Sequence, residues 1–274
     1  MNVRSAGDDA QSRKERWLRI LLPIVVLAAG MALWHLVVRL YDLPPYVLPG
    51  PLLVFSTLVS DWPVLSASLL VTLTTTLEGF LLAAFGGVGL AIIFNQSRLI
   101  EYSLYPYAVI LQVTPVVAIA PLILIWVGFE RINLALTIIA TIVAFFPILA
   151  GATLGLKSAD FNLIDLTRLH GASRLQTLWR IRLPTALPYL LSGMKTAGGL
   201  ALIGAVVAEF VAGSGTATGL AWRIVESGNR LEIATLFAAL ALLAATGVVI
   251  FAALSLLEWW LLRRWHESAI SAQP

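Results

Sequence analysis

Cysteine is absent from the 274 residues, and charged residues make up only 12% of them. The first absence excludes disulfide bonds, thiolate metal sites and a cysteine nucleophile. The second excludes a single soluble globule, because soluble domains carry about 25% charged residues. Hydrophobic residues instead reach 59%, with a mean hydropathy of +0.90. This composition predicts an integral membrane protein. Because its basic residues flank hydrophobic runs, their excess does not indicate a nucleic-acid partner.

Motifs for nucleotide binding and catalysis are also missing. The sequence holds no G-x4-G-K-[ST] phosphate loop, so any nucleotide is expected on another chain. The histidines, His35, His170 and His266, are too far apart in sequence and in predicted depth to suggest a metal site or a catalytic triad. No nucleophile with a matching base is apparent, so neither catalytic nor metal-binding residues are predicted.

Long apolar runs are the dominant feature that is present. A helix needs roughly 20 apolar residues to cross a bilayer, and helices are favoured there because lipid offers the backbone no hydrogen bonds. We therefore predict an all-α integral membrane protein with six transmembrane helices. The six segments are Trp17–Leu40, Leu69–Phe94, Leu104–Trp126, Ile132–Leu156, Tyr189–Ala212 and Ile233–Leu262.

The predicted organisation divides the chain at the ends of these runs. Residues 1–16 form a cytoplasmic tail, and 17–40 the first transmembrane helix. Residues 41–68 form a periplasmic linker rich in proline, with a short surface helix at about Pro51–Ser60. Residues 69–265 form a five-helix core that carries a cytoplasmic loop at 157–188, and 266–274 form a second tail.

Lysine and arginine predict the orientation. With the N-terminus inside, 13 basic residues lie on the cytoplasmic side and 4 outside, and Lys195 falls within a span. This bias places both termini and the 157–188 loop in the cytoplasm. The first apolar run also invites an alternative interpretation as a cleaved signal peptide, but it continues past Ala28–Gly30 to Leu40, longer than such segments usually are.

The cytoplasmic loop predicts two short helices joined by a glycine. Ser158 or Asp160 can cap the first helix, and Gly171 suits the left-handed residue that ends it. The second helix is expected over Ala172–Leu183 and to stop near Pro184.

The second of these helices carries a short apolar pattern. Leu175, Leu178 and Trp179 follow helical spacing and predict one apolar face beside arginines. The pattern alone allows two interpretations, a docking surface for a soluble partner and a basic loop lying on anionic lipid headgroups.

A resemblance favours the docking surface. The spacing D-x5-G-x9-I-x-L-P resembles the EAA loop of ATP-binding-cassette importer permeases, whose consensus is E-A-A-x3-G-x9-I-x-L-P. The opening triplet departs from it, because Asp165-Leu166-Thr167 keeps a carboxylate but replaces a small residue with leucine. The resemblance implies coupling to an ATPase through Asp165, Thr167, Gly171, Ile181, Leu183 and Pro184.

Other segments resemble one branch of these permeases, which serves nitrate, sulfonates, taurine and pyrimidine precursors. The matching segments are Leu48–Pro51, Thr114–Pro121, Trp126–Phe129 and Val207–Glu209. The resemblance covers about residues 48–265. It implies the type I importer permease fold and a place in the bacterial inner membrane.

The same resemblance implies the partners. Two ATPase subunits would bind ATP and magnesium, so that this chain itself holds no cofactor. A second permease copy would complete the path, most simply as a homodimer. A periplasmic solute-binding protein would deliver a small polar solute, and it would carry most of the selectivity, so the solute itself cannot be predicted from this chain.

Polar residues within the spans are candidates for the translocation path. A charge at mid-bilayer costs about 2.5–3.5 kcal/mol on insertion scales, so such residues usually face protein or water. Glu209 is interpreted as a path or gate residue, against a helix-end carboxylate. Lys195 either reaches the headgroups or pairs with a carboxylate on another span, and Glu78 favours a structural contact. Thr114-Pro115 predicts a kink that opens the path or merely serves packing.

An ion-gradient-driven secondary transporter is the main alternative function. Such proteins often contain two inverted halves with similar broken helices, and no internal repeat of this kind is apparent here.

Overall fold

The computed structural model describes residues 6–213 and 218–263, and the fold over these residues is helical, without a strand. The sequence prediction of an all-α chain is thereby confirmed. The helices are α1 (Ala6–Leu40), α2 (Pro51–Ser60), α3 (Trp62–Gln96), α4 (Arg98–Val113), α5 (Val116–Val127), α6 (Ile132–Lys157), α7 (Phe161–Leu169), α8 (Arg174–Thr177), α9 (Leu183–Ala212), α10 (Leu220–Asn229) and α11 (Ile233–Leu262).

Within the described residues, five helices are long and apolar enough to cross a membrane, and a bent pair makes a sixth candidate. The five segments are Leu21–Leu40, Trp62–Gln96, Ile132–Lys157, Arg174–Ala212 and Ile233–Leu262. The number of spans therefore agrees with the predicted six if the bent pair counts as one.

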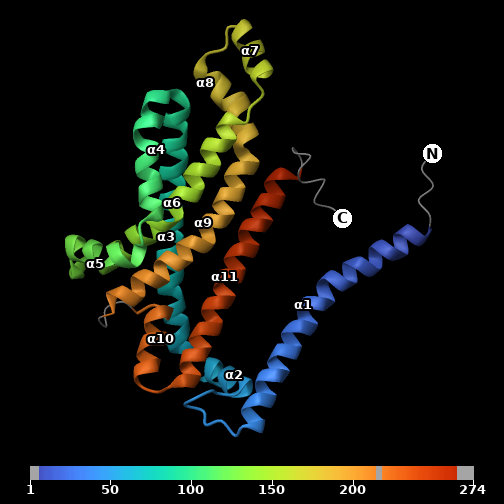
Figure 1. The fold of residues 1–274 in the computed structure, drawn as a ribbon, viewed down its shortest axis with the longest axis vertical. Coiled ribbons are helices and arrows are strands. Elements are labelled where there is room, and N and C mark those ends of the chain that lie inside the picture. The colour runs from blue at the N-terminus through green and yellow to red at the C-terminus, as the bar shows by residue number, and fades with distance from the viewer. Residues whose placement is uncertain (1–5, 214–217, 264–274) are drawn as a thin grey trace.

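The predicted third span, Leu104–Trp126, is wrong as a continuous helix. It is broken at Thr114 and Pro115 into α4 and α5, which meet at 102°. Pro115 has no amide hydrogen to continue the ladder, and its extended backbone (ψ 114°) turns the chain. Figure 1 shows α5 projecting sideways from the end of α4.

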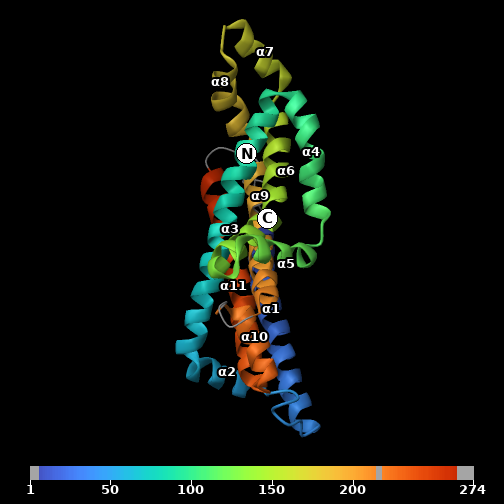
Figure 2. The same ribbon diagram turned by 90° about the vertical axis from the view of Figure 1, so that its left-hand side faces the viewer.

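Two ends of the molecule can be distinguished. The hairpin formed by α7 and α8 lies at one end, and α2 and α10 lie at the other, as the turned view also shows (Figure 2). Helix α1 stands apart from the bundle along most of its length, and none of the residues of its apolar segment, Leu21–Leu40, is buried. It touches α11 through Trp34, whose ring centroid lies 5.7 Å from that of Phe237.

Close contact between α6 and α9 forms the centre of the bundle. A Cβ atom added at Gly151 would lie 2.8 Å from the carbonyl oxygen of Tyr189, and one at Gly155 would lie 2.8 Å from the Cα of Ala186. The two backbones are therefore as close as glycine allows, which is the usual way in which membrane helices associate tightly. Helix α3 covers the same pair, so that Phe80, Ala144 and Ala197 share one buried cluster.

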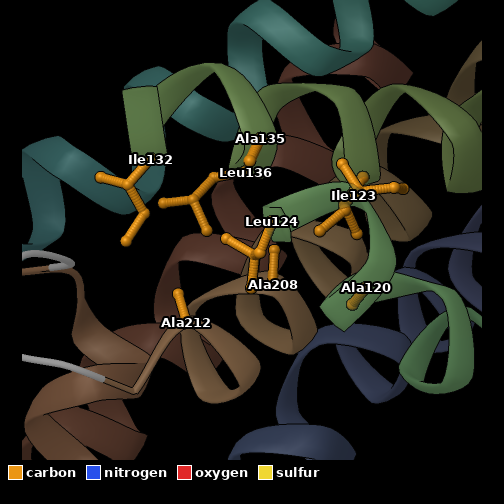
Figure 3. Packing of buried hydrophobic residues seen from close by; sticks show 9 residues of the cluster. Ala120, Ile123, Leu124, Ile132, Ala135, Leu136, Ala208 and Ala212 are labelled. Atoms are coloured by element: carbon orange, nitrogen blue, oxygen red, sulfur yellow. The ribbon is translucent and has the colours of Figure 1, made fainter. Parts of the chain in front are cut away.

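Helix α5 reaches this centre from the side. Its residues Ala120, Ile123 and Leu124 pack against α6 and against Ala208 and Ala212 near the end of α9 (Figure 3). The sideways helix is therefore fixed by apolar contacts to the end of α9 that lies farthest from the hairpin.

Gly193→Ala is expected to destabilise the bundle, because the added Cβ would lie 2.6 Å from the Pro147 carbonyl oxygen. Overpacking of this kind costs about 1–3 kcal/mol. Gly199→Ala on the same helix is the matched control, since its Cβ meets no atom within 4 Å. Thermal unfolding of the detergent-purified chain measures both variants, and equal melting temperatures would contradict the close contact.

Candidate functional site

The hairpin between α6 and α9 is built around a glycine elbow. Asp160 caps α7 by accepting a hydrogen bond from the Asn162 amide at 2.9 Å. Gly171 has a φ of +72°, the left-handed conformation that side chains disfavour. Its amide donates to the Arg168 carbonyl at 2.9 Å, and α7 ends there. Both the cap and the left-handed glycine were expected from the sequence.

The second half of the hairpin differs from the prediction. Instead of one helix ending near Pro184, α8 passes into a π-helical turn, Leu178–Arg182, and the chain continues directly into α9. Pro184 lies in the first turn of α9, directly after the π turn, and the helix continues through it. The hairpin and α9 are thus mechanically continuous.

A capping box begins α8 and was missed in the sequence. The Ser173 hydroxyl accepts from the Gln176 amide at 3.2 Å, and the Gln176 side chain accepts from the Ser173 amide at 2.8 Å. The S-x-x-Q spacing is the signal that could have located this start.

Two buried side chains fix the hairpin, one against the bundle and one within the hairpin itself. Leu178 packs with Phe94 and Leu149, and Ile181 packs with Ile164 and Ala159. The predicted apolar face of Leu175, Leu178 and Trp179 is therefore wrong for Leu178, which is 2% exposed. Consecutive residues of a helix point about 100° apart, so Leu178 can be buried while its neighbour Trp179 is exposed.

The outer side of the hairpin exposes large apolar residues. Leu169 is 85% exposed and Trp179 is 63% exposed. Leu166 and Leu175 are also exposed to solvent. Grouped apolar residues on a polar segment mark a contact with another molecule. Asp165 lies on the same segment with its side chain 68% exposed, and pairs with Arg168 at 3.3 Å.

The remaining predicted coupling residues have local roles. The Thr167 hydroxyl donates to the Ile164 carbonyl at 2.7 Å and so supports α7. Leu183 is half-buried against the cluster that contains Leu178, at the start of α9. The six residues therefore lie along one continuous path from the exposed hairpin into α9.

Glu209 lies near the other end of α9 and is fully buried. Its carboxylate accepts a hydrogen bond from the Thr72 hydroxyl of α3 at 2.7 Å and one from the Ala221 amide of α10 at 2.9 Å. Thr72 in turn accepts from the Leu220 amide at 2.8 Å. The two side chains together satisfy amides at the start of α10, where the helix macrodipole favours negative charge.

This arrangement ties three helices together through one carboxylate. Gly219 packs directly on it, because an added Cβ would fall 2.2 Å from the carboxyl carbon of Glu209. Both sequence interpretations of Glu209, a gate residue and a helix-end carboxylate, are compatible with this position. Residues 214–217 of the glycine- and threonine-rich run lie outside the described residues.

Lys195 and Glu78 have partners on other helices. Lys195 forms an ion pair with Glu258 of α11 and lies 5.5 Å from the centre of the Phe251 ring. Glu78 is exposed on α3, and its carboxylate accepts from the Thr137 hydroxyl of α6 at 2.9 Å. Lys195 thus follows the pairing alternative rather than the headgroup alternative.

The path candidates do not converge on one site. Glu209 and Lys195 are 14 residues apart on α9, which corresponds to about 21 Å along the helix. The Thr114 hydroxyl donates to the Ile110 carbonyl within its own helix at 2.7 Å, and Pro115 begins α5. Thr72 was missed because its contact with Glu209 joins residues far apart in sequence. Among the described residues, no group of three histidine or carboxylate side chains could hold a metal.

Comparison with known proteins gives consistent matches. The family described as "Binding-protein-dependent transport system inner membrane component" matches residues 83–265. The riboflavin transport system permease protein RibX of Chloroflexus aurantiacus is 35% identical over 92% of each chain. The formylaminopyrimidine transport permease protein ThiX of Halalkalibacterium halodurans is 30% identical over 89% of this chain and 96% of its own.

A solved structure has a similar fold. It is that of the MetNI methionine ABC transporter in inward-facing conformations, with a TM-score of 0.54 and 20% identity. The likeness covers 74% of this chain and 95% of that chain.

Thr72→Val is expected to loosen the start of α10, because it removes the donor to Glu209 and the acceptor of the Leu220 amide. The loss of a hydrogen bond that leaves a buried group unpaired costs about 1–3 kcal/mol of folding free energy. Hydrogen exchange at Leu220 and Ala221 should become faster. Thr74→Val is the control, since the Thr74 hydroxyl donates only to carbonyls of its own helix. Equal exchange in the two variants would contradict the role given to Thr72.

Proposed function

The chain belongs to the family of binding-protein-dependent transport system inner membrane components. We propose which of its residues bind an ATPase partner, which transmit motion and which lie at the translocation path. It is a multi-pass membrane protein and a permease subunit of an ATP-binding-cassette importer. The proposal concerns the partners, the coupling residues and the path.

The exposed side of the hairpin is the docking surface for a separate ATPase. Leu169 and Trp179 supply apolar contact, and Asp165 and the nearby arginines supply charge at the rim. ATP and magnesium bind to that partner, and this chain contributes no catalytic group. The single observation that supports this most is the continuity of the exposed hairpin with α9 through the π turn.

Motion at the hairpin is transmitted along α9. Its 30 residues span about 45 Å, and its glycine contacts with α6 leave little room for the two helices to slide. Closure of two ATPase subunits on ATP would move the hairpin, and the far end of α9 would move Glu209 against Thr72 and α10. A shift of this kind selects between two arrangements of packed helices.

Two copies of the chain form the path. Glu78, exposed at mid-helix on α3, faces either the second copy or the path, because a carboxylate facing lipid is unfavourable. Helices α1 and α11 both extend from the end with α2 and α10 in the direction of the hairpin, although neither described end reaches the hairpin (Figure 1). We propose that the hairpin and both termini lie on the cytoplasmic side of the bacterial inner membrane, as the distribution of lysine and arginine in the sequence predicts.

The solute is a small polar molecule delivered by a periplasmic binding protein. Sulfonates, taurine, nitrate and pyrimidine precursors are the candidates. The relatives named for riboflavin and formylaminopyrimidine favour a heteroaromatic solute for the first trials.

Uptake into proteoliposomes tests the whole proposal. The chain is reconstituted with and without its ATPase subunit, and solute-loaded binding protein is added outside. Accumulation is expected only with the ATPase and internal ATP. Accumulation driven by an ion gradient in vesicles that contain this chain alone would contradict it.

Gly171→Val is expected to uncouple ATP hydrolysis from transport. A left-handed conformation costs a residue with a side chain roughly 1–2 kcal/mol, so the elbow would rearrange while the bundle remains folded. Solute-stimulated ATP hydrolysis should fall about tenfold or more. Gly171→Asn is the matched control, because asparagine adopts this conformation more readily. Normal stimulation in the valine variant would refute the role of the elbow.

Glu209→Gln is expected to impair uptake more than assembly. The amide keeps the size of the side chain, but it removes the charge that faces the start of α10, and hydrogen bonds to charged groups contribute about 1.5–3 kcal/mol. Uptake should fall about tenfold, with the amount of co-purified ATPase unchanged. Full uptake in this variant would exclude Glu209 from the gate.

A further inference from the structure

A cavity of about 650 Å³ lies where the hairpin meets the α3–α4 turn and the end of α6. Its volume falls in the range of small-molecule sites. The residues around it come from elements that are far apart in sequence, so the fold itself creates it. Its charged lining consists of Arg98, Glu101, Lys157, Arg168, Arg174 and Arg182.

The charges around this cavity are unbalanced. Lys157 forms an ion pair with Glu101, the one carboxylate in the lining, and Arg168 pairs with Asp165. Arg98, Arg174 and Arg182 have no carboxylate partner among residues 6–213 and 218–263. Three guanidinium groups around one cavity repel each other. An anion bound between them would attract all three and so outweigh that repulsion.

The cavity shares Arg168 with the rim of the docking surface but does not include the apolar residues of that surface. The strongly exposed Leu169 and Trp179 do not line it, and neither does Arg180, which lies only two residues from Arg182. Its aromatic lining includes Tyr102 and Phe161, which are 70% and 76% exposed. A phenolic hydroxyl beside guanidinium groups adds a donor suited to phosphate oxygens.

We infer that this cavity binds a phosphate-bearing anion, which bridges the hairpin to the α3–α4 turn. Guanidinium groups match phosphate oxygens in a two-point geometry. Basic pockets at the cytoplasmic side of transmembrane helices also bind anionic headgroups. The same chemistry is offered by a lipid phosphodiester and by a soluble phosphate, so the site accepts a phosphate group from either source.

Binding is tested on the full-length chain in complex with its ATPase. In nanodiscs of phosphatidylcholine, radiolabelled pyrophosphate is titrated as the soluble probe. In a parallel arm, native mass spectrometry compares retention of phosphatidylglycerol with that of phosphatidylcholine. Saturable pyrophosphate binding identifies a cytosolic source, and preferential retention of phosphatidylglycerol identifies a lipid. Either result supports the site where the arginine variants of the cavity weaken it, because pyrophosphate bound by the ATPase itself would be unaffected by those variants.

Variants assign the binding to the cavity. Combined Arg98→Gln and Arg182→Gln should weaken the observed binding at least about tenfold, because two charge-assisted contacts are lost. Arg180→Gln is the matched control and should keep the affinity. Arg98→Gln alone should weaken binding in part, and because Arg98 begins α4 its replacement leaves the hairpin sequence intact.

Several results would overturn the site. The inference fails if neither arm shows binding, or if Arg180→Gln and the double variant bind equally well. Pyrophosphate binding that appears only after the ATPase is removed would show instead that the cavity belongs to the ATPase interface. None of these measurements requires solute transport, so they stand apart from the test of the proposed function.

Discussion

The close contact of α6 with α9 is the constraint on which the rest of this molecule depends. At Gly151, Gly155 and Gly193 the two backbones approach so closely that a single added carbon would collide with main-chain atoms. The hairpin is the connection between these same two helices, so both of its ends are fixed to one tightly packed pair. An external push on the hairpin therefore acts on the pair as a unit, since neither helix can slide without breaking these contacts.

The other end of α9 is where such a displacement meets resistance. Glu209 connects α9 to Thr72 of α3 and to the start of α10, and the apolar side of the same end packs against α5. A buried carboxylate with two good donors is stable in one geometry and costly in any geometry that leaves it unpaired. This end of α9 is therefore held in one arrangement, and displacing it requires new partners for the carboxylate.

Local sequence signals predicted the elements that are locally determined. Pro51 begins α2, Asp160 caps α7 and Gly171 adopts the left-handed conformation, because each depends on its own backbone geometry. These capping and glycine signals also located the hairpin. The bend between α4 and α5 was only partly predicted, since a proline within a span indicates a kink but its 102° angle depends on packing.

Contacts between distant segments could not be predicted in this way. Thr72 looks like one of several threonines on α3, and only its position opposite Glu209 distinguishes it. The π turn likewise has no pattern of its own. Both Leu178 and Ile181 within it are buried, but each belongs to a cluster with residues distant in sequence, which no local pattern reveals.

The arginines at the hairpin end of the molecule also show what composition alone does not predict. Insertion into a membrane selects for basic residues on the cytoplasmic side without specifying where each one lies. That bias accounts for Arg180 as well as it does for Arg182. Of these two residues, however, only Arg182 lines the cavity, together with Arg98 and Arg174. Orientation alone gives no reason for unpaired cations to converge, because dispersed charges would serve it with less mutual repulsion. Their convergence beside the hairpin is therefore better explained by an anion that they hold in common.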